Sequence, residues 1–288
     1  MRQRIESRAG IQLWESLAAM AQLSRIDTGG EAYRSLVRRD RLRLLEMHYA
    51  AGVGHIGGNL SALDAMLALH HREMGSDDIF ILSKGHAAGA LYITLWTLGL
   101  LSDAQLAEFH GEGTRLPGHP APSGVPGIPL ATGSLGHGFP MAAGISLAKR
   151  FSDQPGRVFC LTSDGEWEEG STWEALIFAR HQALENLTVL IDANGLQGFG
   201  STTDVASLNS DSLGDRISAF GVPVEAVDGH DADAIIASLE RKLPGPRFVV
   251  LRTVKGKGVS FMEGRMEWHY LPLTEELYAR AVRELEAR

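Results

Sequence analysis

Two polar clusters in the sequence have the residue types of a metal-dependent diphosphate site. Residues 163–170 read Ser-Asp-Gly-Glu-Trp-Glu-Glu-Gly and contain Asp164, while residues 192–197 read Asp-Ala-Asn-Gly-Leu-Gln and contain Asn194. Carboxylate and amide oxygens suit Mg²⁺, with Ca²⁺ as an alternative, and they do not suit Zn²⁺. Gly165 lets the backbone approach an anion closely, and the helix expected after the first cluster offers free N–H groups to a diphosphate.

Neither cluster by itself is specific evidence for a diphosphate site. An Asp-Gly pair after a strand is most often only a turn, and acidic residues at the start of a helix can simply be solvated there. Each cluster, however, follows a short apolar run, at 158–161 and 187–191, and one helical stretch separates the two. Ligands of a parallel sheet bind outside the carboxyl ends of its strands, so we expect Asp164 and Asn194 to face one volume.

Histidines next to glycines recur along the chain. Glycine lets the backbone turn sharply or approach a ligand, and imidazole donates, accepts or titrates near neutral pH. One such pair is most often part of an ordinary loop, but several together indicate a site. The histidines concerned are His55, His86, His119, His137 and His230.

Buried strands and covering helices must position these residues. Apolar runs of strand length alternate with stretches of helical periodicity over most of the chain, which predicts an α/β fold. Because the runs are apolar throughout, we expect a parallel sheet of about five or six strands with helices on both faces. The predicted strands are 79–82, 158–161, 187–191, 223–226 and 247–251, and the predicted helices are 32–49, 61–71, 87–98, 139–150, 171–184, 232–242 and 274–286.

The remaining segments define the organisation of the chain. Residues 1–31 are predicted as an N-terminal helical extension and residues 32–288 as one α/β domain, with no linker that would divide it. Ser61 is a plausible N-cap for the helix 61–71. The stretch 111–138 is rich in glycine and proline and has no periodicity, and a loop of this length is usually functional or disordered.

Composition excludes several classes of protein. The chain has 288 residues and a formal charge of −8, whereas a general nucleic-acid binder needs a basic surface. No apolar run approaches the roughly 20 residues that cross a bilayer. The single cysteine, Cys160, excludes an intrachain disulfide and a thiolate zinc site, and a reducing cytoplasm fits it best. We therefore expect a cytoplasmic protein that binds neither nucleic acid nor membranes.

The two clusters resemble the binding motif of the thiamine diphosphate enzymes, which reads Gly-Asp-Gly and, one helix later, Asn. Here Ser163 replaces the first glycine, and Asp164 and Asn194 match the motif. The resemblance implies thiamine diphosphate and Mg²⁺ as cofactors. It also implies that the metal ligands are the side chains of Asp164 and Asn194 and the backbone carbonyl of Leu196.

Within these enzymes the sequence resembles transketolase over about residues 32–272. The segments that carry this resemblance are Ala51-Gly-Val-Gly-His55, Leu82-Ser-Lys-Gly-His86, Pro117-Gly-His-Pro120, Thr132-Gly-Ser-Leu-Gly-His-Gly138 and Lys255-Gly-Lys-Gly258 followed by Trp268-His269. Five segments in order are far more specific than the metal motif alone. His137 departs from the family, which more often has glutamine there.

The resemblance implies a role for each matching position. His55, His86, His119 and His269 are the implied catalytic residues around the reacting carbon and the donor sugar. The implied cofactor-binding residues are His86, Gly133, Ser134, Leu135, Gly165, Glu166, Asn194, Leu196 and His269. The implied reaction moves a two-carbon ketol unit from a ketose, as a sugar or sugar phosphate, to an aldose.

The length of the chain resembles the N-terminal subunit of a transketolase encoded as two chains. In the family the glutamate that activates thiamine belongs to a second module, and no residue here matches it. We therefore expect a separate C-terminal subunit that carries this glutamate, a heterotetramer, and an inactive chain when isolated. Two alternatives remain. One is another thiamine enzyme, of the 2-oxo acid dehydrogenase E1 or deoxyxylulose phosphate synthase type, and the other is a non-catalytic scaffold of the same fold.

Overall fold

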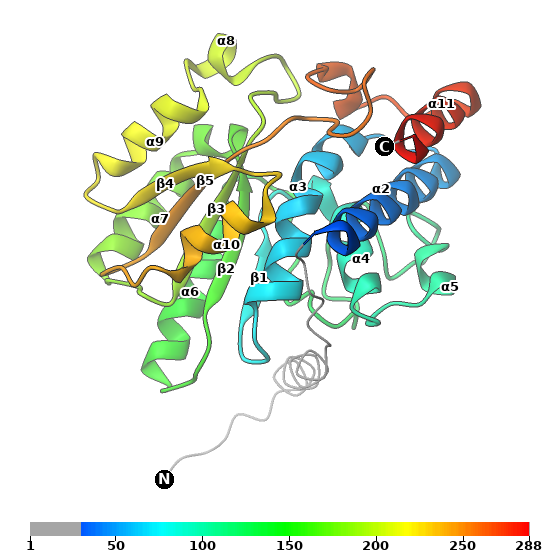
Figure 1. Ribbon diagram of the computed structural model, residues 1–288. Helices are drawn as coiled ribbons and strands as arrows, with labels where there is room; N and C mark the ends of the chain where they lie inside the picture. Colours follow the sequence, from blue (N-terminus) through cyan, green and yellow to red (C-terminus); the bar gives the residue numbers. More distant parts are fainter. Residues whose placement is uncertain (1–29, 288) are drawn as a thin grey trace.

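A five-stranded parallel sheet forms the centre of the protein in a computed structural model, in which residues 30–287 are described. Its strand order is β1-β2-β3-β5-β4, and every neighbouring pair is parallel (Figure 1). The predicted fold class is therefore confirmed, with the smaller of the two expected strand numbers. The strands are β1 Ile79–Leu82, β2 Val158–Ser163, β3 Leu187–Ala193, β4 Val224–Asp228 and β5 Arg247–Arg252.

Helices cover both faces of the sheet because successive strand residues point to opposite sides. In β1, Phe80 and Leu82 belong to one buried apolar cluster, while Ile79 and Ile81 belong to another. The first cluster joins the sheet to α2 (Glu31–Ala51), α3 (Ile56–Ala68), α4 (Ala88–Thr97), α10 (Ala232–Glu240) and α11 (Glu275–Glu286). The second joins it to α6 (Gly138–Phe151), α7 (Gly170–His181) and α9 (Ser210–Ser218).

The start of α3 differs from the sequence prediction. The helix begins at Ile56, so the N-cap assigned to Ser61 is wrong, and Ser61 is a buried residue inside the helix. The glycines before Ser61 are typical of a loop, but Gly57 is a helical residue in close contact with its neighbours. A Cβ there would lie 3.0 Å from Lys255 Cγ and 3.1 Å from Trp268 Cβ. Close packing, not a turn, requires this glycine.

Several short elements are not predicted from the sequence because they are too short to show a period. They are α5 (Asp103–Leu106), α8 (Thr202–Ala206), a π-helical turn (Leu69–Glu73) and 3₁₀ turns at Gly85–Ala87, Gly165–Glu168 and Met266–His269. The long loop was predicted correctly, since residues 111–137 contain neither helix nor strand. The predicted N-terminal extension lies outside the described residues, apart from its last two positions.

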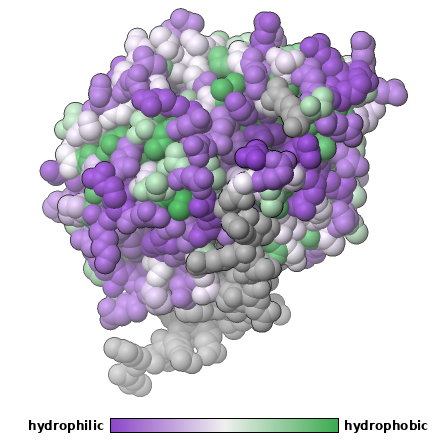
Figure 2. All heavy atoms as spheres, in the orientation of Figure 1, coloured by the Kyte–Doolittle hydropathy of each residue, from purple (hydrophilic) through white to green (hydrophobic). Residues whose placement is uncertain are grey.

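The surface is largely hydrophilic on the face seen in Figure 2. Among the helices within residues 30–287, none combines the length and the apolar character needed to cross a membrane.

Candidate active site

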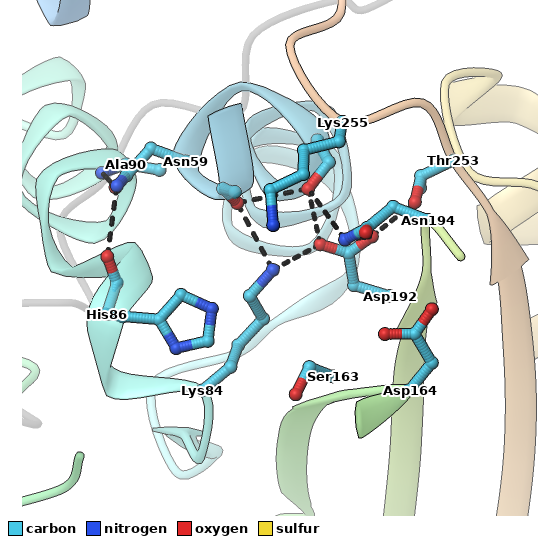
Figure 3. A network of polar contacts seen from close by, with 12 residues as sticks. Asn59, Lys84, His86, Ala90, Ser163, Asp164, Asp192, Asn194, Thr253 and Lys255 are labelled. Atoms are coloured by element: carbon cyan, nitrogen blue, oxygen red, sulfur yellow. Dashed lines mark hydrogen bonds and ion pairs between the residues drawn. The ribbon is translucent and has the colours of Figure 1, made fainter. Parts of the chain in front are cut away.

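Four segments that follow strands meet at the carboxyl-terminal ends of the strands (Figure 3). They are the turn after β1 with Lys84, the turn after β2 with Asp164, the turn after β3 with Asn194, and the segment after β5 with Lys255. Because all strands are parallel, these turns emerge on the same side. The sequence prediction that Asp164 and Asn194 face one volume follows from this topology.

Asp164 joins the two polar clusters. Its Oδ1 accepts the Gly165 N–H at 2.9 Å, and its Oδ2 accepts the Gly195 N–H at 2.6 Å. The residue is only 4% exposed. Burial and the nearby charge of Asp192 raise the pKa of Asp164 to about 6. The carboxylate is therefore placed where a bound cation would stabilise its charged form.

The side-chain amide of Asn194 is held in one orientation. Its Nδ2 lies 3.4 Å from Asp192 Oδ1, and its Oδ1 accepts the Leu196 N–H at 3.1 Å. The Leu196 carbonyl, the third expected ligand, accepts from Lys255 Nζ at 3.3 Å and keeps a second lone pair.

These oxygens are the type of ligand that Mg²⁺ or Ca²⁺ prefers, but three of them do not complete the coordination of either ion. A carboxylate, an amide and a carbonyl supply hard oxygen donors, which such cations prefer. Among the residues that the structure describes, no group of three or more His, Cys, Asp or Glu side chains is placed to hold a metal. An ion at this position would therefore complete its coordination with diphosphate oxygens, which agrees with the diphosphate site expected from the sequence.

A buried ion pair lies beneath the expected metal ligands. Lys84 Nζ pairs with Asp192 Oδ2, and both side chains are fully buried. Ser61 Oγ donates to the same oxygen at 2.6 Å, and Thr253 Oγ1 donates to Asp192 Oδ1. Burial opposes the charge of Asp192, but Lys84 and the two hydroxyls outweigh it and lower its pKa. This pair is missed by sequence reasoning, and its only signal is that Lys84 lies within one of the five segments that resemble transketolase.

The four histidines expected to be catalytic lie together. The His55 ring centroid is 5.7 Å from that of His86, 5.9 Å from that of His119 and 5.1 Å from that of His269. Burial, with the neighbouring histidines and lysines, lowers the pKa of His55 to about 4 and that of His269 to about 3. Burial also lowers the pKa of His86 and of His119. All four rings are therefore neutral at pH 7.

Lys255 connects the histidines to the expected metal site, a role that the sequence does not predict. Its Nζ lies 2.9 Å from His269 Nδ1 and 3.3 Å from the Leu196 carbonyl. Burial and the charge of Lys84 lower the pKa of Lys255 to about 8. An ammonium can only donate, so His269 accepts at Nδ1 and carries its proton on Nε2.

The loop that holds Gly133, Ser134 and Leu135 is fixed against the sheet by Glu166. The Glu166 carboxylate accepts the Gly136 N–H at 2.9 Å and the hydroxyl of Ser83. Gly133 itself has φ 138° and contacts His119, so a side chain there would overlap the imidazole.

Glu166 is buried, and the resemblance implies that it binds the cofactor. Its oxygens accept hydrogen bonds from the protein, so Glu166 also holds the loop in place. Its direct contact with the cofactor stays a prediction.

Two of the histidines next to glycine lie outside this group. His137 is exposed, and its Nδ1 lies 3.0 Å from the Leu135 carbonyl. His230 holds Asp64 Oδ2 at 2.6 Å and accepts the Val254 N–H at 2.9 Å, so both of its nitrogens bond the protein. The resemblance left both out of the expected catalytic residues, and in the structure their rings bond Leu135, Asp64 and Val254.

A parallel α/β domain with carboxylate, amide and imidazole side chains at the carboxyl ends of its strands defines a cofactor-binding module for a diphosphate. Residues 36–286 match the family described as "Transketolase, thiamine diphosphate binding domain". The chain belongs to this family, so the resemblance inferred from its motifs is confirmed.

Relatives and solved structures agree with this assignment. The chain is 38% identical over 243 residues to a protein of Actinobacillus succinogenes named as one subunit of an apulose-4-phosphate transketolase, covering 81% of this chain and 87% of that protein. It is 39% identical over 247 residues to the 6-deoxy-6-sulfo-D-fructose transketolase subunit SqwG of Clostridium sp. strain MSTE9, covering 82% and 89%. A transketolase variant from Pichia stipitis superposes with a TM-score of 0.79 at 28% identity, covering 90% of this chain and 40% of that one.

These matches bear out the prediction of an N-terminal transketolase subunit. The chain spans most of the relatives that are named subunits but only about two fifths of the P. stipitis transketolase.

Proposed function

We propose that this chain binds thiamine diphosphate through a Mg²⁺ ion held by Asp164, Asn194 and the Leu196 carbonyl, and that it forms half of a two-chain transketolase. The observation that carries the proposal is the bond between Asp164 Oδ2 and the Gly195 N–H, which joins both halves of the motif beside the histidine cluster. Ca²⁺ would suit the same oxygens.

The histidines would bind the donor sugar and move its protons. When bound, thiamine diphosphate supplies an electron sink for breaking and forming carbon–carbon bonds. The neutral rings of His55, His86 and His119 can each donate one hydrogen bond and accept another, which suits hydroxyl groups. Because Lys255 holds Nδ1 of His269, that ring offers Nε2–H to the ligand.

The partner is proposed to be a separate C-terminal subunit with the glutamate that activates the cofactor, in a heterotetramer. Support comes from the two relatives named as subunits, which the chain covers almost completely. Their names give a sugar phosphate and a sulfo sugar, which supports a sugar or sugar phosphate as the substrate here. The cytoplasmic location stays a prediction.

Calorimetry tests the binding site directly. Thiamine diphosphate is titrated into the full chain, mixed with its partner, in the presence and absence of Mg²⁺. Asp164→Ala should abolish the binding that depends on Mg²⁺. Asp78→Ala is the matched control. Asp78 is equally buried, at 4% exposure, but it lies before β1, at the amino-terminal ends of the strands. Unchanged binding by Asp164→Ala would show that the metal site is elsewhere.

Ketol transfer from a ketose phosphate, measured with and without the partner, tests the reaction. We expect transfer only from the two chains together. Full activity of this chain alone would contradict the need for a partner. Binding of the cofactor by both chains together without any transfer would favour the scaffold instead.

A further inference from the structure

The Asn194 amide is oriented by a residue that the metal motif does not include. Its Nδ2 lies 3.4 Å from Asp192 Oδ1, and its Oδ1 accepts the Leu196 N–H at 3.1 Å on the other side. An ionised carboxylate only accepts hydrogen bonds, so Asp192 admits the NH₂ end of the amide and repels the oxygen end. Asp192 and the Leu196 N–H together direct the amide oxygen toward the turn that also binds Asp164.

Asp192 is itself immobilised from three directions. Lys84 Nζ and Ser61 Oγ donate to its Oδ2, and Thr253 Oγ1 donates to its Oδ1 (Figure 3). These donors come from the turn after β1, from α3 and from the segment after β5. Asp192 is fully buried near the end of β3. Its carboxylate therefore has one orientation, and it transfers that orientation to Asn194.

We propose that Asp192 is a positioning residue that turns the Asn194 amide oxygen toward the metal ion without contacting the ion or the substrate. The inference rests on the proposed function of the site. A buried ion pair is often no more stabilising than apolar groups of the same size. Here the Lys84–Asp192 pair fixes the orientation of the Asp192 carboxylate, so that its Oδ1 faces Asn194 and Thr253.

Asp192→Asn separates positioning from charge. Lys84 would hold the oxygen of the new amide, so its NH₂ group would face the NH₂ group of Asn194. Inverting Asn194 would relieve that clash but would turn its NH₂ group onto the Leu196 N–H, so neither orientation of the Asn194 amide is held as in the wild type. In the full chain with its partner, at a fixed concentration of thiamine diphosphate, the Mg²⁺ concentration for half-saturation should rise about 10- to 100-fold, as for other residues that orient metal ligands. Calorimetry measures this value independently of turnover.

A control variant distinguishes positioning from general destabilisation. Arg157→Met with Asp78→Asn removes the two ion pairs that Arg157 makes with Asp78 and Glu73, at the amino-terminal ends of the strands, where Asp78 is also buried. This variant should unfold at lower urea concentration without any change in the Mg²⁺ requirement. A similar rise in the Mg²⁺ requirement in the control would overturn the positioning role, because loss of stability alone would then explain it.

If Asp192→Asn fails to fold, Lys84→Met combined with Asp192→Asn removes the unpaired charge and should restore folding. That double variant leaves the amide orientation undetermined, and we expect at least about a tenfold rise in the Mg²⁺ requirement. A folded variant with the wild-type requirement would overturn the positioning role and leave the proposed function intact. Absence of Mg²⁺-dependent binding in the wild type would overturn both.

Discussion

Removal of the Lys84 ammonium should destabilise the fold more than removal of any surface cation. Lys84→Met keeps much of the side-chain volume but takes the counterion from Asp192, and both side chains are fully buried. In Arg34→Met, by contrast, the lost partner is Glu31, and those two side chains are 71% and 79% exposed.

The magnitudes follow from this difference in burial. Breaking a buried ion pair by removing one partner costs about 3–5 kcal/mol, because the remaining charge is left in a poorly solvated environment. Ser61, Thr253 and Asn194 still donate to Asp192, so we expect the lower end, about 3 kcal/mol. The exposed pair of Arg34 contributes at most about 1 kcal/mol.

Urea denaturation of the full chain, followed by circular dichroism, measures both free energies of unfolding by linear extrapolation. Lys84→Met combined with Asp192→Asn should recover most of the loss, because no charge is then left unpaired. The reasoning would be refuted if Lys84→Met and Arg34→Met unfolded within about 1 kcal/mol of each other.

Three further outcomes are expected. Burial lowers the pKa of His48 to about 4, so as the pH falls the unfolded chain protonates His48 before the folded chain does. The buried neutral imidazole therefore contributes its full stability above about pH 6.5, and this contribution is lost as the pH falls toward 4. Between pH 7 and pH 5 this loss is about 2 kcal/mol, and His48→Gln should show a correspondingly smaller acid sensitivity in urea titrations. Glu166→Gln places an NH₂ group opposite hydrogen-bond donors, including the Gly136 N–H, and should lower the free energy of unfolding by about 1–3 kcal/mol in the same assay. An unchanged free energy of unfolding would argue against the contact between Glu166 and Gly136. Gly54→Ala brings a methyl group onto the Tyr270 carbonyl and should cost about 1–3 kcal/mol, whereas wild-type stability would show that the segment can move aside.

Local pattern predicted much of the fold. The apolar run 79–82 is β1 to the residue, and the runs at 158–161 and 187–191 are each two residues short of their strands. The missing residues include Thr162 and Ser163 in one strand and Asp192 in the other, which are polar because the strands continue into the site. An apolar pattern cannot indicate where a strand stops when its last residues carry function.

The start of α3 shows the opposite error. Gly57 and Gly58 are typical of a loop when only neighbouring positions are considered, yet both are helical. Gly57 packs against Lys255 and Trp268, which are about two hundred positions away in the chain. The close approach that demands glycine exists only after folding.

By itself, the sequence determined the fold class, the two halves of the diphosphate motif and the four histidines, because residue type and order carry these features. Only the tertiary structure placed the rings of those four histidines together, and it showed that His230 bonds Asp64 instead. It also showed that Lys84 and Asp192 form a buried pair across 108 positions. Ion pairing and hydrogen-bond direction depend on distances between segments, and the folding of the sheet sets those distances.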